Sequence, residues 1–360
     1  AVFLAFLHAA VAGEEAGVAQ LLDHAARGAL VALAFDRRGF AEHVLEGAGG
    51  SLANGAGLSG DAAALQADAY VVPEGGTAMV YVTDPQNRER LRPKLAEMLR
   101  ATEGVDRVLG EAEFAALGLP AIHGLILLND PRTGIPTAVL DAGPITAERT
   151  AAVSGVVIRT WAPPIAGRAP SVAIVGAGTQ ARSHLPVVGH VLPGAHVALF
   201  DRHPERAEAL ADTARGTPGI TGAEVAPTPR DAVTGADVVI TVASFTTPDR
   251  RQVMTDDWLG SDTLVVPVDY ATYCSADVAR NAALFLVDER DQFLANRDAG
   301  NFDGYPDPSA MIGEALLAGT PRPRGRVVVT HLGVGLADVV FGDAILAAAA
   351  TRGRGTLLAR

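Results

Sequence analysis

The sequence is poor in cysteine, lysine and aromatic residues. Among 360 residues there is one cysteine, Cys274, and one lysine, Lys94, and aromatic residues make up 5%. A lone cysteine excludes a disulfide framework and a zinc site built on several cysteines. Acidic residues outnumber basic ones by 41 to 29, which gives a formal net charge of −12. We therefore expect neither nucleic acid nor an anionic membrane as a partner, because both repel a negatively charged protein.

Long apolar runs are also absent. The residues of segment 1–11 are nearly all apolar, but a membrane-spanning helix needs about 20 such residues. No basic leader of the kind found in signal peptides precedes them. We therefore expect a soluble, cytoplasmic protein. Hydrophobic residues make up 49% of the sequence, which is enough to pack the cores of two domains of roughly 100–200 residues each.

Short apolar runs alternate with helical stretches from Ser171 onward. The expected strands are Ser171–Val175, His196–Phe200, Ala236–Val242, Thr263–Val268 and Ala283–Val287. Buried parallel strands that alternate with helices form a doubly wound α/β sheet. The sequence therefore predicts such a sheet for the region from about residue 163 to residue 329.

The region before this sheet has a different pattern. It contains, in order, a helical stretch Glu14–Arg27, a glycine-rich segment Gly47–Gly60, an apolar run Ala78–Val82, an amphipathic helix Glu89–Arg100 and a strand–turn–strand segment Ile122–Asp141. A helix over residues 144–162 follows, and the pair Pro163-Pro164 ends it. We expect a second, α+β domain here.

A glycine motif joins the first strand of the predicted sheet to the helix after it. Gly176-Ala177-Gly178-Thr179-Gln180-Ala181 has the G-x-G-x-x-A pattern, in which the glycines permit a tight turn and close approach of a pyrophosphate. The helix N-terminus offers free N–H groups to the phosphates. Asp201 ends the second strand and is placed to accept hydrogen bonds from the adenosine ribose. The predicted cofactor-binding residues are Gly176, Gly178, Thr179, Gln180, Ala181, Asp201 and Arg202.

Other cofactors remain open at this point. A carboxylate at Asp201 would repel a 2′-phosphate and so favours NAD over NADP, whereas Arg202 beside it could accept that phosphate. Two alternatives to a nicotinamide cofactor stay open. The loop could bind a flavin, or it could be a glycine turn that binds no cofactor.

Several ordered segments resemble the ornithine cyclodeaminase/mu-crystallin family. Besides the glycine motif and Asp201, they are Ile145–Ser154, which is similar to the family's T-A-x-R-T-A-A-x-S helix, Gly118-Leu119-Pro120 with Asn129–Pro136, and the closing segment Leu332–Asp338. The resemblance spans about residues 118–360. It implies a Rossmann domain and an NAD-dependent reaction in which a hydride moves to or from an α-amino or imino acid, with deamination and cyclisation in the cyclodeaminases.

The resemblance also implies roles for individual residues. Arg149 matches the family's arginine for the substrate carboxylate, and Asp269, after a strand, matches its catalytic aspartate. The alternatives are a salt bridge on the helix surface for Arg149 and a structural cap for Asp269. Val242 and Ser244, after the third predicted strand, are expected in the wall of the cofactor site, and Gly333 is a further predicted cofactor-binding residue. His331 is expected to face the nicotinamide, with a purely structural histidine as the alternative. The resemblance implies a homodimer.

Two features depart from the family pattern. The family's lysine, about a dozen residues before the Gly-Leu-Pro segment, has no counterpart, and Arg107 near that position is a poor proton carrier because a guanidinium stays protonated. Residues 1–117 do not fit the family and faintly resemble part of an alkaline-phosphatase-superfamily phosphodiesterase. Their possible metal ligands are His24, His43 and the segment Phe35–Phe40, but without an Asp-His-Gly motif we predict no metal. Three interpretations of residues 1–117 stay open: a natural fusion, an N-terminal half of the family that has diverged beyond recognition, or a segment of a composite chain.

The predicted organisation is therefore a divergent N-terminal region (1–117), a substrate and dimerisation domain (118–162 and 330–360) and an NAD-binding Rossmann domain (163–329). The main functional hypothesis is an NAD-dependent enzyme that acts on an amino or imino acid. The alternatives are a ketimine reductase or amino-acid dehydrogenase, a non-catalytic mu-crystallin-like dinucleotide-binding protein, and phosphodiesterase activity of the N-terminal region.

Overall fold

The computed structural model describes residues 52–54, 69–74, 77–82, 88–101, 124–246 and 248–356. The chain divides into two compact units, one of which is Gly28–His123 and the other of which holds the residues from Gly124 onward. The predicted helix Glu14–Arg27 lies outside the described residues, as do Arg107, His24, His43 and Phe35–Phe40.

The smaller unit contains a three-stranded sheet in the order β1-β2-β3, formed by Leu52–Asn54, Ala69–Glu74 and Thr77–Val82. Strand β1 pairs parallel with β2, and β2 pairs antiparallel with β3. Helix α4, Arg88–Ala101, follows and carries Lys94. The apolar run Ala78–Val82 forms most of β3, and the predicted helix at Glu89–Arg100 is confirmed.

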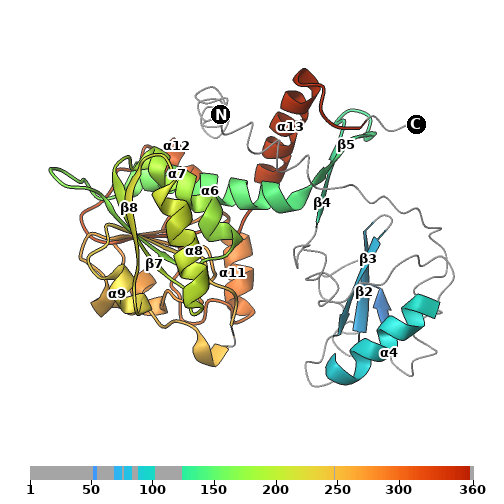
Figure 1. Ribbon diagram of the computed structural model, residues 1–360, viewed down its shortest axis with the longest axis horizontal. Helices are drawn as coiled ribbons and strands as arrows, with labels where there is room; N and C mark the ends of the chain where they lie inside the picture. The colour runs from blue at the N-terminus through green and yellow to red at the C-terminus, as the bar shows by residue number, and fades with distance from the viewer. Residues whose placement is uncertain are drawn as a thin grey trace. The chain divides into compact units, whose positions relative to one another are not determined.

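The larger unit is built on a parallel sheet of eight strands (Figure 1). In chain order the strands are β6 (Ser171–Val175), β7 (Ala195–Phe200), β8 (Ile220–Val225), β9 (Val238–Thr241), β10 (Leu264–Pro267), β11 (Leu284–Val287), β12 (Ala310–Met311) and β13 (Val327–Thr330). They lie in the order β8-β7-β6-β9-β10-β13-β11-β12. The chain therefore reverses its direction of travel across the sheet between β6 and β9, and a ligand crevice is expected at such a switch point.

Helices cover both faces of this sheet. They are α7 (Thr179–Val191), α8 (Pro204–Arg215), α9 (Pro229–Val233), α10 (Ala276–Arg280), α11 (Arg290–Asp298) and α12 (Ile312–Leu317), with 3-10 turns at Pro248–Arg250 and Asp256–Trp258. Alternate residues of each strand enter two separate cores: Val172 and Ile174 pack into one, and Ala173 and Val175 into the other. Because both faces of the sheet are buried, these strands appear in the sequence as continuous apolar runs.

The five predicted strands and helix Pro204–Arg215 are confirmed, within one or two residues at their ends. Three strands were not predicted. Strand β8 at the sheet edge carries Gly222 and Glu224 and is only partly buried, and β12 has two residues. Strand β13 is fully buried but comes last in the chain and inserts between β10 and β11, which sequence order does not reveal.

A hairpin and two helices complete the larger unit. Strands β4 (Leu125–Asn129) and β5 (Pro136–Asp141) form the predicted antiparallel hairpin, and α6 (Ala142–Trp161) follows it directly. The Asp141 carboxylate caps α6 by accepting the Gly143 N–H at 2.9 Å. Helix α13 (Gly335–Thr351) packs on α6 and on the hairpin, where an added Cβ at Gly342 would lie 3.1 Å from Leu140 and 3.3 Å from Leu128.

Helix α6 connects this part to the sheet (Figure 1). It packs closely on α7, because a Cβ at Gly155 would come within 2.6 Å of Val187. Its last residue, Trp161, is fully buried. The predicted helix at 144–162 is thus confirmed. Within the described part of the chain, the helices are too short or too polar to cross a membrane.

Candidate functional site

The glycine loop lies at the switch point of the sheet. Gly176 follows β6 with φ +111°, and an added Cβ would lie 2.7 Å from the carbonyl oxygen of Val242, which follows β9. Glycine is therefore required by both backbone conformation and space. Gly178 begins α7 and is exposed; it has no side chain to cap the helix, and an added Cβ there would meet nothing within 4 Å. The first N–H groups of α7 are therefore available to an anion.

Asp201 joins the end of β7 to the glycine loop. Its carboxylate accepts the N–H of Ala177 at 2.8 Å and the N–H of His203 at 2.9 Å. These two hydrogen bonds hold the Asp201 side chain beside the loop, where the sequence predicts a residue that binds the adenosine ribose. Arg202 is exposed, and its Nε donates to Nε2 of His203 at 3.2 Å rather than to Asp201.

Asp269 is a buried carboxylate next to the same loop. It is 2% exposed and accepts the Thr241 hydroxyl at 2.8 Å and the Ala243 N–H at 3.2 Å. The segment 241–243 thus contacts Gly176 on one side and Asp269 on the other, which brings these two predicted residues together. Burial raises the pKa of Asp269 to about 7, although its hydrogen bonds act in the opposite direction. A carboxyl group with this pKa can both donate and accept a proton near neutral pH.

This pKa predicts how folding stability depends on pH. The pKa in the folded protein, about 7, lies above the ordinary value of 3.8, so the stabilising effect is complete below pH 3.8 and is lost as pH rises through 7. We expect the free energy of unfolding of the wild type, relative to Asp269→Asn, to fall by roughly 4 kcal/mol between pH 4 and pH 8. Urea titrations followed by tryptophan fluorescence measure it, since Trp161 and Trp258 both lie in the larger unit.

Asp237 supplies a control of opposite sign. Burial acts to raise its pKa, but hydrogen bonds from Arg168 and from the Ser171 N–H outweigh burial and hold the pKa below its usual value. The wild type should therefore lose stability relative to Asp237→Asn as pH falls through the acidic range. Equal pH profiles for the two variants would contradict the assignment of Asp269.

Arg149 lies on α6 and faces the start of α13. Its Nε donates to Oδ1 of Asp338 at 3.1 Å, and its guanidinium packs directly against Gly333. Among the described residues, its two terminal nitrogens have no hydrogen-bond acceptor. The side chain is 11% exposed. A guanidinium oriented through Nε by one carboxylate can still bind a second carboxylate through its outer N–H groups.

The turn against which Arg149 packs is held by Asp288. This residue follows β11, and its Oδ2 accepts the N–H groups of Leu332 and Gly333 at 2.9 and 2.7 Å. Sequence reasoning missed Asp288, yet its pattern was visible: like Asp201 and Asp269, it directly follows the apolar run of a parallel strand. Asp338 and Thr241 were also missed, because their partners are distant in sequence.

The remaining predicted residues occupy different surroundings. His331 is buried directly after β13, and Val242 is buried beneath the glycine loop. Ser244 is exposed. Burial raises the pKa of Cys274 to about 12, so the thiol is not a nucleophile at neutral pH. The described residues contain no group of three or more potential metal-ligating side chains.

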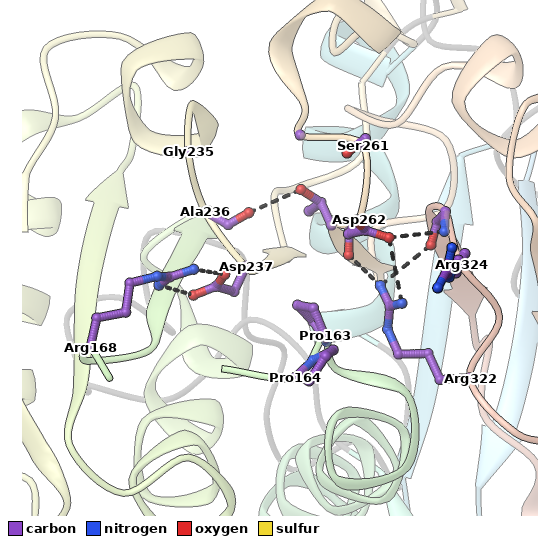
Figure 2. Close-up of a pocket in the computed structure, with 13 residues that line it drawn as sticks. Pro163, Pro164, Arg168, Gly235, Ala236, Asp237, Ser261, Asp262, Arg322 and Arg324 are labelled. Carbon is purple, nitrogen blue, oxygen red and sulfur yellow. Dashed lines mark hydrogen bonds and ion pairs between the residues drawn. The ribbon is translucent and has the colours of Figure 1, made fainter. Parts of the chain in front are cut away.

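A groove of about 770 Å³ lies at the opposite, amino-terminal edge of the sheet (Figure 2). Two of the arginines that line it are already bound: Arg168 makes a two-pronged contact with Asp237 at 2.6 and 2.5 Å, and Arg322 donates to the carbonyl oxygens of Trp161 and Pro323 at 3.0 and 2.8 Å. The glycine loop and Asp269 lie at the carboxyl edge instead, and we place the candidate site there.

The strand order, the glycine loop at the switch point and the carboxylate after the second strand define the eight-stranded sheet and the helices that cover it as a dinucleotide-binding Rossmann domain. The sequence profile of the ornithine cyclodeaminase/mu-crystallin family matches residues 76–298, and the chain belongs to this family.

Individual relatives agree with this assignment. The chain is 31% identical to nodulation efficiency protein NfeD of Rhizobium meliloti, over 68% of this chain and 74% of that protein. It is 31% identical to ketimine reductase mu-crystallin of Mus musculus, over 62% and 68%. Among solved structures, Delta(1)-pyrroline-2-carboxylate reductase of Thermococcus litoralis, in complex with NADH and L-proline, matches with a TM-score of 0.59 at 25% identity, over 68% and 77%.

The profile match corrects one boundary. It begins at residue 76, upstream of Gly118 where the recognised pattern was expected to start. Part of the region that was set apart as divergent therefore belongs to the family. The faint phosphodiesterase resemblance of residues 1–117 finds no support in these comparisons.

Proposed function

We propose that this protein is an NAD-dependent enzyme that transfers a hydride to or from an α-amino or imino acid at the carboxyl edge of the sheet. The single observation that carries the proposal is Asp269, a buried carboxyl group with a pKa of about 7 that shares the segment 241–243 with the glycine loop. A proton-transfer group is thereby placed beside a dinucleotide-binding turn.

The residues present fit a dinucleotide. The Gly176–Ala181 loop would receive the pyrophosphate, because Gly178 leaves open space above the free N–H groups of α7. Asp201 would hold the adenosine ribose. Val242, Ser244, His331 and Gly333 would lie on the nicotinamide side. When bound, NAD(H) supplies the hydride. A relative of 25% identity has been solved with NADH, which supports this cofactor.

Substrate binding is assigned to Arg149, whose outer N–H groups would take the substrate carboxylate while Asp338 holds its Nε. Asp269 would give a proton to, or take a proton from, the substrate nitrogen or another group bonded to the substrate's α-carbon. The names of the relatives, ketimine reductase and pyrroline-2-carboxylate reductase, favour reduction of a cyclic imino acid over cyclodeamination. No lysine stands about a dozen residues before Gly118-Leu119-Pro120, where the family pattern has one; the chain's one lysine, Lys94, lies further upstream, on α4.

The test is an NADH oxidation assay with Δ1-pyrroline-2-carboxylate and its six-membered analogue, run beside NAD reduction with ornithine, lysine and alanine. We expect turnover with at least one cyclic imino acid. Tight NADH binding without turnover on any of these compounds would instead support a non-catalytic dinucleotide-binding protein.

We predict that Asp201 sets the preference for NADH over NADPH. Asp201→Asn keeps an acceptor for the Ala177 N–H but removes the charge that repels a 2′-phosphate, so the NADPH-to-NADH affinity ratio should rise about tenfold or more. Fluorescence titration measures both affinities. Asp212→Asn on exposed α8 removes the same charge elsewhere and should leave the ratio unchanged. An equal effect of both variants would show that net charge alone is responsible.

We also propose a homodimer that buries the outer face of the β4–β5 hairpin. Leu125, Leu127 and Val139 on this face are 56%, 53% and 40% exposed, and such apolar patches mark interaction surfaces. Leu127→Asp should raise the dimer dissociation constant at least about 100-fold, measured by light scattering across a dilution series. Leu317→Asp on α12, 76% exposed, is the matched control. A wild type that is monomeric at all concentrations would refute the dimer. The cytoplasmic location stays a prediction from the sequence.

A further inference from the structure

A buried chain of three polar side chains connects α6, α7 and the end of β13. The Ser154 hydroxyl oxygen lies 2.8 Å from Nε2 of His184 and 2.9 Å from Nε2 of His331. All three residues are at most 2% exposed. The proposed function assigns no role to Ser154 or His184.

The direction of each hydrogen bond follows from one backbone carbonyl. Nδ1 of His184 lies 2.6 Å from the carbonyl oxygen of Gln180, and a carbonyl only accepts, so Nδ1 carries the hydrogen. Burial lowers the pKa of His184 to about 4, so the ring is neutral near pH 7 and its Nε2 has a free lone pair. Ser154 must therefore donate its single hydrogen to His184. It follows that the Ser154 oxygen accepts the Nε2–H of His331.

The chain ends at an acceptor without a partner. Burial, with the charge of neighbouring Arg149, lowers the pKa of His331 to about 3, so this ring is also neutral. Since its hydrogen is on Nε2, its Nδ1 presents a lone pair. That atom is buried and has no hydrogen-bond partner among the described residues. A buried acceptor left without a partner is unfavourable, which calls for a donor from a ligand.

We propose that Nδ1 of His331 accepts a hydrogen bond from an N–H group of the bound ligand, and that Ser154 and His184 are positioning residues that lock His331 in this acceptor form. This inference rests on the proposed function. The donor is either the substrate's amine or iminium N–H or the carboxamide N–H of nicotinamide. A substrate carboxylate on Arg149 would place the α-nitrogen close to His331. Because His331 stays neutral, it orients the N–H group, and the proton itself is left to Asp269.

The positions of the ring hydrogens on His184 and His331 can be observed by nuclear magnetic resonance on the full chain labelled with 15N-histidine. Long-range 15N–1H correlations identify which ring nitrogen carries hydrogen, and His184→Gln and His331→Asn assign the signals. We expect the Nδ1–H form for His184 and the Nε2–H form for His331. The opposite form of His331 would overturn the proposal. Ser154→Ala should produce a mixture of His331 forms, whereas Ser154→Cys, which retains a weak donor, should restore part of the Nε2–H population.

Ligand additions then identify the donor. A shift of the His331 Nδ1 resonance on addition of NADH alone assigns the carboxamide, and a shift that appears only with NAD plus L-proline assigns the substrate nitrogen. No shift with both ligands bound would overturn the contact. NADH fluorescence follows binding independently. Absence of NADH binding would refute both the proposed function and the contact between His331 and the ligand. The ligand-free spectrum would still show whether Ser154 and His184 hold His331 in the Nε2–H form.

Kinetics provide a second readout. His331→Phe removes the acceptor and should raise either the Kd for NADH or the KM for the imino acid by about 10- to 100-fold, according to which ligand donates. His331→Asn places an oxygen near the position of Nδ1 and should recover part of this loss. Equal parameters for the wild type and His331→Phe, in a variant with unchanged tryptophan fluorescence, would refute the role of His331.

Discussion

Asp269→Asn is expected to lower kcat for imino-acid reduction by about 10²- to 10⁴-fold, the range typical of a lost general acid or base, while the Kd for NADH changes little. The amide has the same shape as the carboxyl group, and it can accept the Ala243 N–H while donating to the Thr241 hydroxyl oxygen. It cannot exchange a proton near neutral pH. Steady-state assays with saturating NADH, together with fluorescence titration, separate the two parameters.

The pH profile of the wild type adds an independent check on this residue. An essential group with a pKa of about 7 in the ligand-free protein should produce one limb of the kcat/KM profile near neutrality, and the limb should be missing from the residual activity of Asp269→Asn. Asp237→Asn is the control, because it neutralises a buried carboxylate at the opposite edge of the sheet. Loss of activity in both variants to the same extent would attribute the effect to the fold.

Gly178→Ala is expected to weaken NADH binding at least about tenfold without unfolding the protein. In the structure an added Cβ at this position meets nothing within 4 Å and the φ angle of −83° suits alanine, so the fold should tolerate the change. The methyl group would, however, occupy the space through which the pyrophosphate approaches the N–H groups of α7. Fluorescence titration measures affinity, and urea titration measures stability.

Gly176→Ala provides the contrast. Here φ is +111° and the Cβ would collide with the Val242 carbonyl, so we expect loss of stability as well as of binding. If Gly178→Ala bound NADH as tightly as the wild type while remaining folded, the pyrophosphate would have to lie elsewhere.

Much of this site could be predicted from local sequence patterns. The strand before Gly176, the two glycines and the acid at the end of the next strand depend on residues close together in the chain, and the structure has each of these elements where it was expected. Arg149 and Asp269 depended on resemblance to the family. The structure adds their surroundings, a buried pocket for the carboxyl group and an ion pair for the guanidinium, but their roles remain proposals.

The rest depends on contacts between distant segments. Ser154, His184 and His331 form one hydrogen-bonded chain, yet 177 positions separate the first and last of them, and no local pattern links them. The central place of β13 is a similar case, because the order of parallel strands is set by crossover connections. Asp288 was within reach, since it ends a predicted strand as Asp201 and Asp269 do.

Transfer of a hydride between a nicotinamide and an imino acid is the reaction that we propose for this chain. It is tested most directly by mass spectrometry of the product formed from Δ1-pyrroline-2-carboxylate and from its six-membered analogue with NADH that carries deuterium at both hydrogen positions of nicotinamide C4. We expect one deuterium at the α-carbon of the product with the wild type, and far less product with Asp269→Asn. NADH binding by the wild type with no deuterium transferred to either compound would contradict it.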